Sequence, residues 1–286
     1  MLERSVRIFQ MKAGSLDKST VQQMQPDDIC FYRLIGGNPI ETSILLEELM
    51  ILKDVQVLVI GLFRFPFRFE GKKRQQTAAE QYYVMRDMAD SVIYFNSDGM
   101  MEMIDPETPI KEAHIRFNIF EEKAIIELER LVDRTGEMNI DAKDILTFIK
   151  TRRGPLFFHS FEGENFDEPL KYAISAPYLP QDYADGEQML INIGCTRGVN
   201  MESYKQMNLR LHDLFHKADL FKLGTYFIDE PGHKFRITLL INGIQDPIPR
   251  PENMKKVNTY PSKLKRKWKT TLQKGRQTVT FHQKHI

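Results

Sequence analysis

The chain has 286 residues, a formal net charge of +1 and 42% hydrophobic residues, which suits one large domain or two modest ones with an ordinary core. No apolar run approaches the ~20 residues that a membrane-spanning helix needs, and the first residues lack the apolar core of a secretory signal. Cys30 and Cys195 lie in apolar, strand-like runs, so we expect a cytoplasmic protein with two reduced core thiols rather than a disulfide.

The charge is unevenly distributed along the chain. From Arg250 to Ile286 there are 11 lysines and arginines against one acid, a net charge of +10, which leaves −9 for the residues before them. A mildly acidic globule therefore carries a basic tail. Prolines at 247, 249, 251 and 261 interrupt regular structure here, and we expect residues 247–286 to be flexible.

The first part of the chain alternates strand-like and helix-like patterns. After a short strand candidate at 6–9, we predict strands at 28–34, 55–63 and 91–95 and helices at 43–52 and 75–88. Residues 55–63 are almost continuously apolar, as expected of a strand covered on both faces. Strands that alternate with helices are typical of βαβ units, so we predict a parallel sheet with flanking helices over 1–107.

The longest helical pattern begins at Thr108 and reaches about Val132. Thr108 suits the cap and Pro109 the first helical position. Apolar residues recur every three or four positions, at 110, 113, 117, 120, 124, 128 and 131, and those at 115, 119, 125, 126 and 132 widen the stripe. We expect a helix within 108–134 that is buried between layers or domains.

The residues after this helix indicate a second α/β domain over 135–246. Here we predict helices at 142–150, 168–176 and 201–217, and strands at 155–160, 188–194, 220–229 and 234–242. The fold class is therefore α/β, with two α/β units joined by one long helix.

Residues 65–74 read FPFRFEGKKR directly after the apolar strand. Taken alone, they describe a strand end, a turn and the start of a basic helix. The stretch resembles the PF-F-EGKKR segment of FtsZ, the bacterial tubulin-like GTPase, and the resemblance runs from about Asp28 to Ile244. It implies a cytoskeletal or cell-division protein with a truncated FtsZ-like nucleotide-domain remnant, a central helix and a C-terminal domain.

Residues 139–144 read NIDAKD and follow the long helix. Taken alone, Asn139 or Asp141 caps the next helix, and Asp144 lies in its first turn. In FtsZ the loop at this place reads N-x-D-x-x-D, enters the nucleotide pocket of the next subunit and helps to position the attacking water. The resemblance therefore implies that Asp141 and Asp144 are catalytic toward a neighbouring subunit, and two carboxylates three positions apart share one helix face.

The phosphate loop of the family, GGGTGTG, is altered here to GGNPIET over residues 36–42. Of the glycines that let a backbone approach phosphate, only Gly36 and Gly37 remain. Pro39 has no N–H to offer, Ile40 adds a branched side chain, and Glu41 adds negative charge. We therefore expect GTP or GDP binding to be lost or weakened.

The rest of the family's nucleotide site is kept unevenly. Residues 1–27 are too few to hold the opening strands and the first glycine-rich loop. On the resemblance, Glu70 and Arg74 match residues that reach the ribose and phosphates, Asn118 falls near a guanine-contacting Asn, and His114 stands where an aromatic ring often faces the base. Taken alone, Arg74 is a solvated helix residue and Asn118 a polar group at a domain boundary. No His or Cys spacing indicates a metal site.

The basic tail contains a short amphipathic pattern. Leu264, Trp268 and Leu272 follow i, i+4, i+8 spacing and would form a thin apolar stripe on a helix. The residues expected to make its contacts are Lys263, Lys265, Arg266, Lys267, Trp268 and Lys269. This pattern suits an anionic membrane surface, nucleic-acid phosphates or the acidic face of a neighbouring subunit, and a disordered solubilising tail is the plain alternative.

The acid loop is kept, whereas the phosphate loop is altered. This combination favours a non-catalytic protein that acts by filament-type association. Its partners are then FtsZ-like subunits or further copies of itself. The alternatives are a GTP-dependent, self-polymerising FtsZ-like GTPase and a membrane- or DNA-tethered scaffold that uses the tail.

Overall fold

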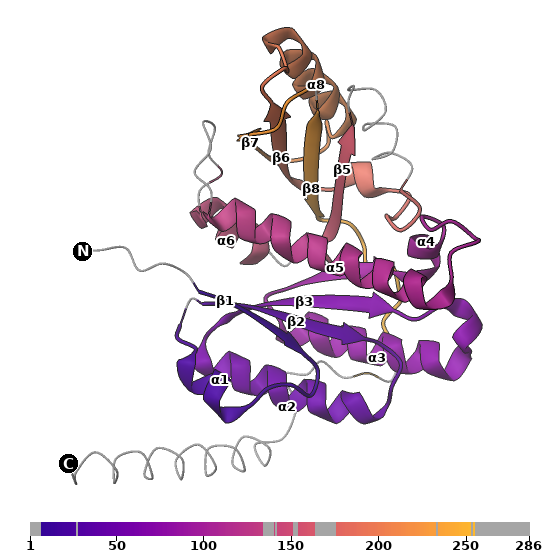
Figure 1. Ribbon diagram of the computed structural model, residues 1–286. Coiled ribbons are helices and arrows are strands. Elements are labelled where there is room, and N and C mark those ends of the chain that lie inside the picture. Colours follow the sequence, from indigo (N-terminus) through magenta and orange to yellow (C-terminus); the bar gives the residue numbers. More distant parts are fainter. Residues whose placement is uncertain are drawn as a thin grey trace, which may run out of the picture.

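The computed structural model describes residues 7–26, 28–133, 140, 142–150, 154–163, 176–232, 234–252 and 254. Two four-stranded sheets lie on either side of the long helix α5 (Ile110–Asp133), which crosses one face of the first sheet (Figure 1). The central helix expected from the apolar spacing is therefore present, and it lies between the two sheets.

The first sheet is parallel throughout, as the βαβ pattern predicts. Its strands are β1 (Ile8–Lys12), β2 (Ile29–Ile35), β3 (Leu58–Phe65) and β4 (Ser91–Asn96), paired in that order. On the face opposite α5 lie α1 (Lys18–Gln23), α2 (Ile40–Val55) and α3 (Lys72–Met88) (Figure 1). The carboxyl ends of parallel strands meet at one edge, so the loops after β1 to β4 are brought together there.

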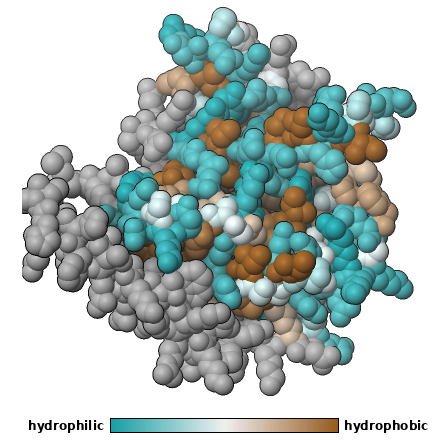
Figure 2. Space-filling view, turned by 60° about the horizontal axis from the view of Figure 1, so that its bottom comes forward, coloured by the Kyte–Doolittle hydropathy of each residue, from teal (hydrophilic) through white to brown (hydrophobic). Residues whose placement is uncertain are grey.

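The core of this sheet explains the near-continuous apolar run in β3, where only Phe65 is not fully buried. Gly61 lets α3 approach closely, since a Cβ at this position would lie 2.3 Å from the Met85 sulfur. The outer side of the helices is solvated: the face turned forward in Figure 2 shows hydrophobic residues in several small patches among hydrophilic ones.

The second sheet is mixed, with strand order β5-β8-β6-β7. Its strands are β5 (Phe157–Gly163), β6 (Gln188–Thr196), β7 (Leu220–Ile228) and β8 (Phe235–Asn242), with β8 antiparallel to β5 and β6. Helix α6 (Ala142–Lys150) follows α5 along the chain, and α8 (Met201–Leu214) lies between β6 and β7 in sequence. The two sheets are joined by hydrogen bonds in which Tyr94 N–H donates to Leu156 O at 3.0 Å and Leu156 N–H donates to Val92 O at 2.7 Å.

Several expectations need correction or completion. The apolar spacing did not predict α1 or the short α4 (Ser97–Met101). Helix α5 is only partly buried: Phe117, Ala124, Ile125 and Leu128 are buried, whereas the exposed apolar residues are Ile110, Ile115, Ile119 and Ile126. The helix expected at 168–176 is described only at its last residue, and the basic segment 263–269 lies outside the described residues.

The expectation of two core thiols is met. Both cysteines are buried and free, and burial raises the pKa of Cys195 to about 11, as expected of core thiols. No helix in the described part of the chain is long and apolar enough to cross a membrane. The first residues of the expected flexible tail are packed on α3 instead: Arg250 has a guanidinium nitrogen 2.5 Å from an Asp87 carboxylate oxygen.

Candidate functional site

The loop after β2 holds Gly36 and Gly37, and its backbone donors are used within the protein. The Gly36 N–H donates to Arg64 O at 2.9 Å, and the Gly37 N–H donates to Gln81 Oε1 at 2.7 Å. Gln81 comes from α3, is fully buried, and donates in turn to Asn38 O at 2.7 Å. The two glycine N–H groups that a phosphate loop would aim at a ligand are therefore already bound.

Gly37 is constrained further by its packing. Its φ of +107° lies in the region that favours glycine, and a Cβ here would lie 2.3 Å from Cγ of Arg74. Arg74 in turn pairs with Glu70 at 2.8 Å, four residues earlier. The structure thus brings Gly36, Gly37, Glu70 and Arg74 to one edge of the sheet, where Glu70 and Arg74 bind each other.

A second set of backbone donors follows β1. The N–H groups of Gly14 and Leu16 both donate to the carboxylate of Glu48 on α2, each at 3.0 Å. The Tyr32 hydroxyl donates to the same carboxylate at 2.5 Å, and Glu48 is buried. A protein carboxylate therefore occupies the N–H groups that a glycine-containing turn at this edge would otherwise present to an anion.

Beneath α5 lies a buried ion cluster that sequence reasoning missed. Glu121 on α5 binds Arg33 of β2 at 2.7 Å and Arg64 of β3 at 3.2 Å. The three side chains are between 5% and 12% exposed, and burial lowers the pKa of Arg64 against the opposing effect of Glu121. The sequence does carry a signal for this cluster, because Arg33 and Arg64 are the only charged residues in two otherwise apolar strands.

This cluster forms part of the wall of a cavity of about 420 Å³ at the carboxyl ends of β1 and β2. His114 and Asn118 of α5 also line it, and both side chains are exposed. Lys12 and Glu41 complete its charged lining. His114 and Asn118, which were predicted to lie near the base, are thus at the same edge as Gly36 and Gly37, which were predicted to hold phosphate. The ion cluster forms part of the wall of the cavity at this edge.

The acid loop lies at the other end of the molecule. Asp141 is outside the described residues, whereas Asp144 lies in the first turn of α6 with 28% of its side chain exposed. Its carboxylate is 3.0 Å from Nζ of Lys222 on β7. We call the edge that carries Gly36, Gly37, Glu70 and Arg74 the nucleotide-type edge. Helix α5, 24 residues or about 36 Å long, runs from this edge, where its His114 and Asn118 lie, toward the α6 end (Figure 1).

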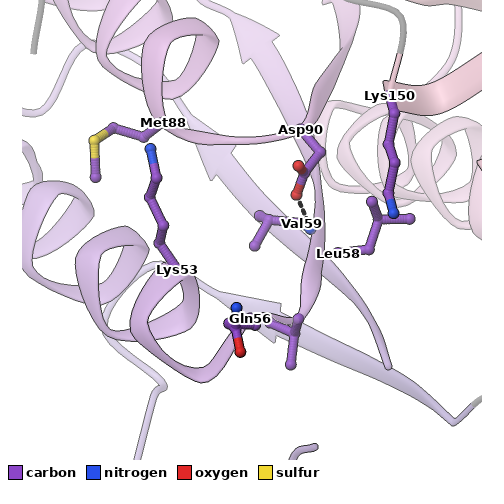
Figure 3. A pocket seen from close by; sticks show the side chains of 8 residues that line it. Lys53, Gln56, Leu58, Val59, Met88, Asp90 and Lys150 are labelled. Atoms are coloured by element: carbon purple, nitrogen blue, oxygen red, sulfur yellow. Dashed lines mark hydrogen bonds between the residues drawn. The ribbon is translucent and has the colours of Figure 1, made fainter. Parts of the chain in front are cut away.

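A smaller cavity of about 290 Å³ lies at the same end as α6, beside the start of β3 (Figure 3). Asp90 accepts a hydrogen bond from the Val59 N–H at 2.8 Å, and Lys53 and Lys150 line the opening from different elements. Asp90, the one acid in its lining, accepts a backbone hydrogen bond, and the two lysines are the cations that this cavity presents at the α6 end. In the described part of the chain no group of three His, Cys, Asp or Glu residues is arranged to hold a metal.

Comparison with known proteins identifies the fold. No family model matches the chain. An empty FtsZ dimer from M. jannaschii matches with a TM-score of 0.66 and 20% identity, over 79% of this chain and 65% of that chain. A GTPγS-bound protofilament of CetZ2 from Haloferax volcanii matches at 0.56 and 15%, over 87% and 71%.

A GTPγS-form protofilament of TubZ from Bacillus thuringiensis serovar israelensis matches at 0.57 and 13%, over 90% of this chain and 68% of that chain. The expected tubulin/FtsZ-like α/β fold is therefore confirmed. The chain spans slightly less than two thirds of the length of the FtsZ chain in the empty dimer.

Proposed function

We propose that this chain, which has the tubulin/FtsZ-like fold, is a cytoskeletal protein that acts by filament-type association with FtsZ-like subunits or further copies of itself. In this proposal it holds no guanine nucleotide of its own. The acid-loop end, with Asp141 and Asp144, docks on the nucleotide edge of a neighbouring subunit. No next subunit docks on the chain's own nucleotide-type edge through a bound nucleotide.

The observation that carries this proposal is the internal use of the backbone donors at the nucleotide-type edge. Gln81 binds the Gly37 N–H, and Glu48 binds the N–H groups of Gly14 and Leu16. A phosphate here would have to displace buried partners and, at Glu48, approach a buried carboxylate. Leaving such buried groups unpaired costs about 1–3 kcal/mol each, which weakens nucleotide binding by one or more orders of magnitude.

Separation of the two ends supports an intermolecular role for the acid loop. Asp144 lies at the far end of α5 from the nucleotide-type edge (Figure 1). In this proposal the acid loop of one chain therefore acts on the edge of another chain. The neighbours of known structure include a dimer of FtsZ and protofilaments of CetZ2 and TubZ, and assemblies of this kind place one subunit's end against the next.

Co-sedimentation with an active FtsZ tests the proposal. We expect this chain to change the FtsZ polymer mass and GTP turnover in a dose-dependent way, and we expect Asp141→Ala combined with Asp144→Ala to abolish the effect. Glu230→Ala combined with Asp182→Ala, at two exposed acids of the second α/β unit, is the matched control. Unchanged polymer mass and turnover over a wide range of ratios would contradict the proposal.

A second function, a self-polymerising GTPase, is favoured by the cavity of about 420 Å³, whose lining includes Lys12 besides the Arg33 and Arg64 that Glu121 binds. In that case the protein binds GTP at micromolar concentration or below, and Asp141→Ala lowers its own GTP turnover. These two measurements together separate the candidates, because the association proposal predicts neither result.

A further inference from the structure

A second surface adjoins the nucleotide-type edge and shares Glu70 and His114 with it, but its apolar lining has no role in either function above. It is a groove of about 850 Å³ between the short helix η1 (Arg68–Glu70) and the residues that join α4 to α5. Phe67, Ile104 and Phe117 are the more buried apolar residues that line it. The exposed apolar residues along it are Phe69 (73%), Met101 (44%) and Ile110 (79%). We call these residues together the apolar groove.

The apolar groove is held in shape by contacts of its own. The rings of Phe67 and Phe69 stack with centroids 4.8 Å apart, and Phe67 also packs against Phe117 at 5.5 Å. The backbone of Phe67 is fixed by Glu70, whose Oε1 accepts its N–H at 3.0 Å. A preformed apolar surface of this kind binds a partner without first paying the full cost of ordering its own side chains.

One side of the groove is acidic. Between α4 and the first turn of α5 lie Glu102, Asp105 and Glu107, all exposed, and Glu102 and Asp105 line the groove. On the opposite side the charges near η1 are paired: Arg68 binds Asp98 at 3.0 Å and Arg74 binds Glu70, while Lys72 and Lys73 follow at the start of α3. The groove therefore combines an apolar lining with one rim that attracts cations.

The chain itself contains a segment with the complementary pattern. Residues 263–272 read KLKRKWKTTL, with five cations and no acid. Leu264, Trp268 and Leu272 fall on one side of a helix at i, i+4, i+8 spacing, which is the pattern of a helix that binds in a hydrophobic groove. Its cations lie beside that stripe, as Glu102 and Asp105 lie along one side of the apolar lining of the groove.

We propose that residues 263–272 dock in the apolar groove, with Trp268 against Phe67, Phe69 and Ile110 and the flanking lysines beside Glu102 and Asp105. Trp buries a large apolar area at low conformational cost, so it is the natural anchor. The charged rim sets the orientation of the segment and makes binding sensitive to salt. The occupied groove lies next to the nucleotide-type edge, so docking there also covers part of the surface that a neighbouring subunit would approach.

The fluorescence of Trp268, the only tryptophan in the chain, tests this directly on the full-length protein. We expect blue-shifted emission at low ionic strength, which moves to the emission of the free 263–272 peptide in Phe69→Ser combined with Ile110→Ser. Both of these side chains are exposed, so the fold is not at risk. Emission like that of the free peptide in the unaltered protein, or emission that ignores these substitutions, overturns the proposal.

Charge reversal gives an independent measurement. Glu102→Lys combined with Asp105→Lys in the full-length protein is expected to weaken docking of residues 263–272 by roughly tenfold, measured from the fraction of blue-shifted Trp268 emission. The control with the same change of net charge is Asp182→Lys combined with Glu230→Lys, where both acids are exposed and belong to the second α/β unit. An equal fraction of blue-shifted emission in the two double variants contradicts the proposal.

Vesicles containing phosphatidylserine separate this docking from membrane attachment. If Trp268 shifts only when these vesicles are added, and Phe69→Ser with Ile110→Ser leaves that shift intact, the tail binds lipid and the proposal fails. If the shift is present without vesicles and depends on the groove, the proposal holds. Dependence of the shift on protein concentration then shows whether the segment comes from the same chain or from a second copy.

Discussion

The nucleotide-type edge and the α6 end differ in how their polar groups are used. At the edge, buried Gln81 and Glu48 bind the backbone N–H groups of the loops after β2 and β1. At the α6 end, Asp144 and Lys222 pair while 28% and 41% of their side chains remain exposed. Groups bound in the interior contribute to stability, whereas groups that stay near solvent remain available to a partner. Substitutions at the edge should therefore change folding, and substitutions at the α6 end should change association.

The largest effect is expected at the buried ion cluster. Glu121→Ala leaves the guanidinium groups of Arg33 and Arg64 without their shared buried carboxylate. Removing one member of a buried ion cluster costs about 3–5 kcal/mol, measured as the free energy of unfolding in urea. Glu122→Ala is the matched control, because Glu122 is 53% exposed and only 3.5 Å from Arg33, and we expect a loss below about 1 kcal/mol. Similar losses at both positions would contradict the assignment of the cluster.

Acid pH should act on the second sheet, through His159 on β5. The Tyr178 hydroxyl bonds its ring, and burial together with the charge of Lys123 lowers the pKa of His159 from 6.5 to about 3. Below pH 6.5 the unfolded chain binds a proton that the folded chain does not, so stability falls as the pH falls toward 3. We expect this residue to account for about 2–3 kcal/mol between pH 6.5 and 4.5.

Unfolding in urea at several pH values measures this effect. The pH dependence should become shallower in His159→Asn, which cannot take up the proton. A slope that is unchanged in this variant would show that other groups cause the acid sensitivity.

A smaller effect is expected at the altered phosphate loop. Gln81→Ala removes the acceptor of the Gly37 N–H and the donor to Asn38 O, and leaving buried groups unpaired costs about 1–3 kcal/mol. Thermal unfolding with and without GDP shows whether Gln81 keeps phosphate out of this loop. If GDP stabilises the variant but not the unaltered protein, Gln81 is what closes the loop to phosphate. If GDP stabilises both equally, the internal hydrogen bonds are not the barrier.

The smallest effect on stability is expected at the α6 end. Asp144→Ala breaks a partly exposed pair with Lys222, which is worth below about 1 kcal/mol. The same variant should nevertheless lose most of the effect on FtsZ polymer mass. Lys222→Ala is the control for the pair itself. If Asp144→Ala unfolds the protein, or if both variants affect the polymer equally, Asp144 acts through the pair and not through a partner.

The alternation of strands and helices was enough to predict the parallel first sheet, since apolar period and turn residues are local signals. Helix α6 was predicted at its observed bounds, Ala142–Lys150, for the same reason. The residues that close the nucleotide-type edge were not predicted. Gln81 and Glu48 are ordinary polar positions in their helices, and only the packing of α2 and α3 under the sheet brings them to the loops. The exposed positions of α5 were likewise invisible, because periodicity identifies an apolar face but not what covers it.

Calorimetric titration of GDP and GTP into the purified protein shows whether the chain binds guanine nucleotide, after the protein as isolated has been checked for bound nucleotide by denaturation and chromatography. We predict no guanine nucleotide in the isolated protein and no heat of binding at micromolar concentrations. Nucleotide that co-purifies in a one-to-one ratio, or a dissociation constant in the micromolar range or below, would show that the loops after β1 and β2 still accept phosphate.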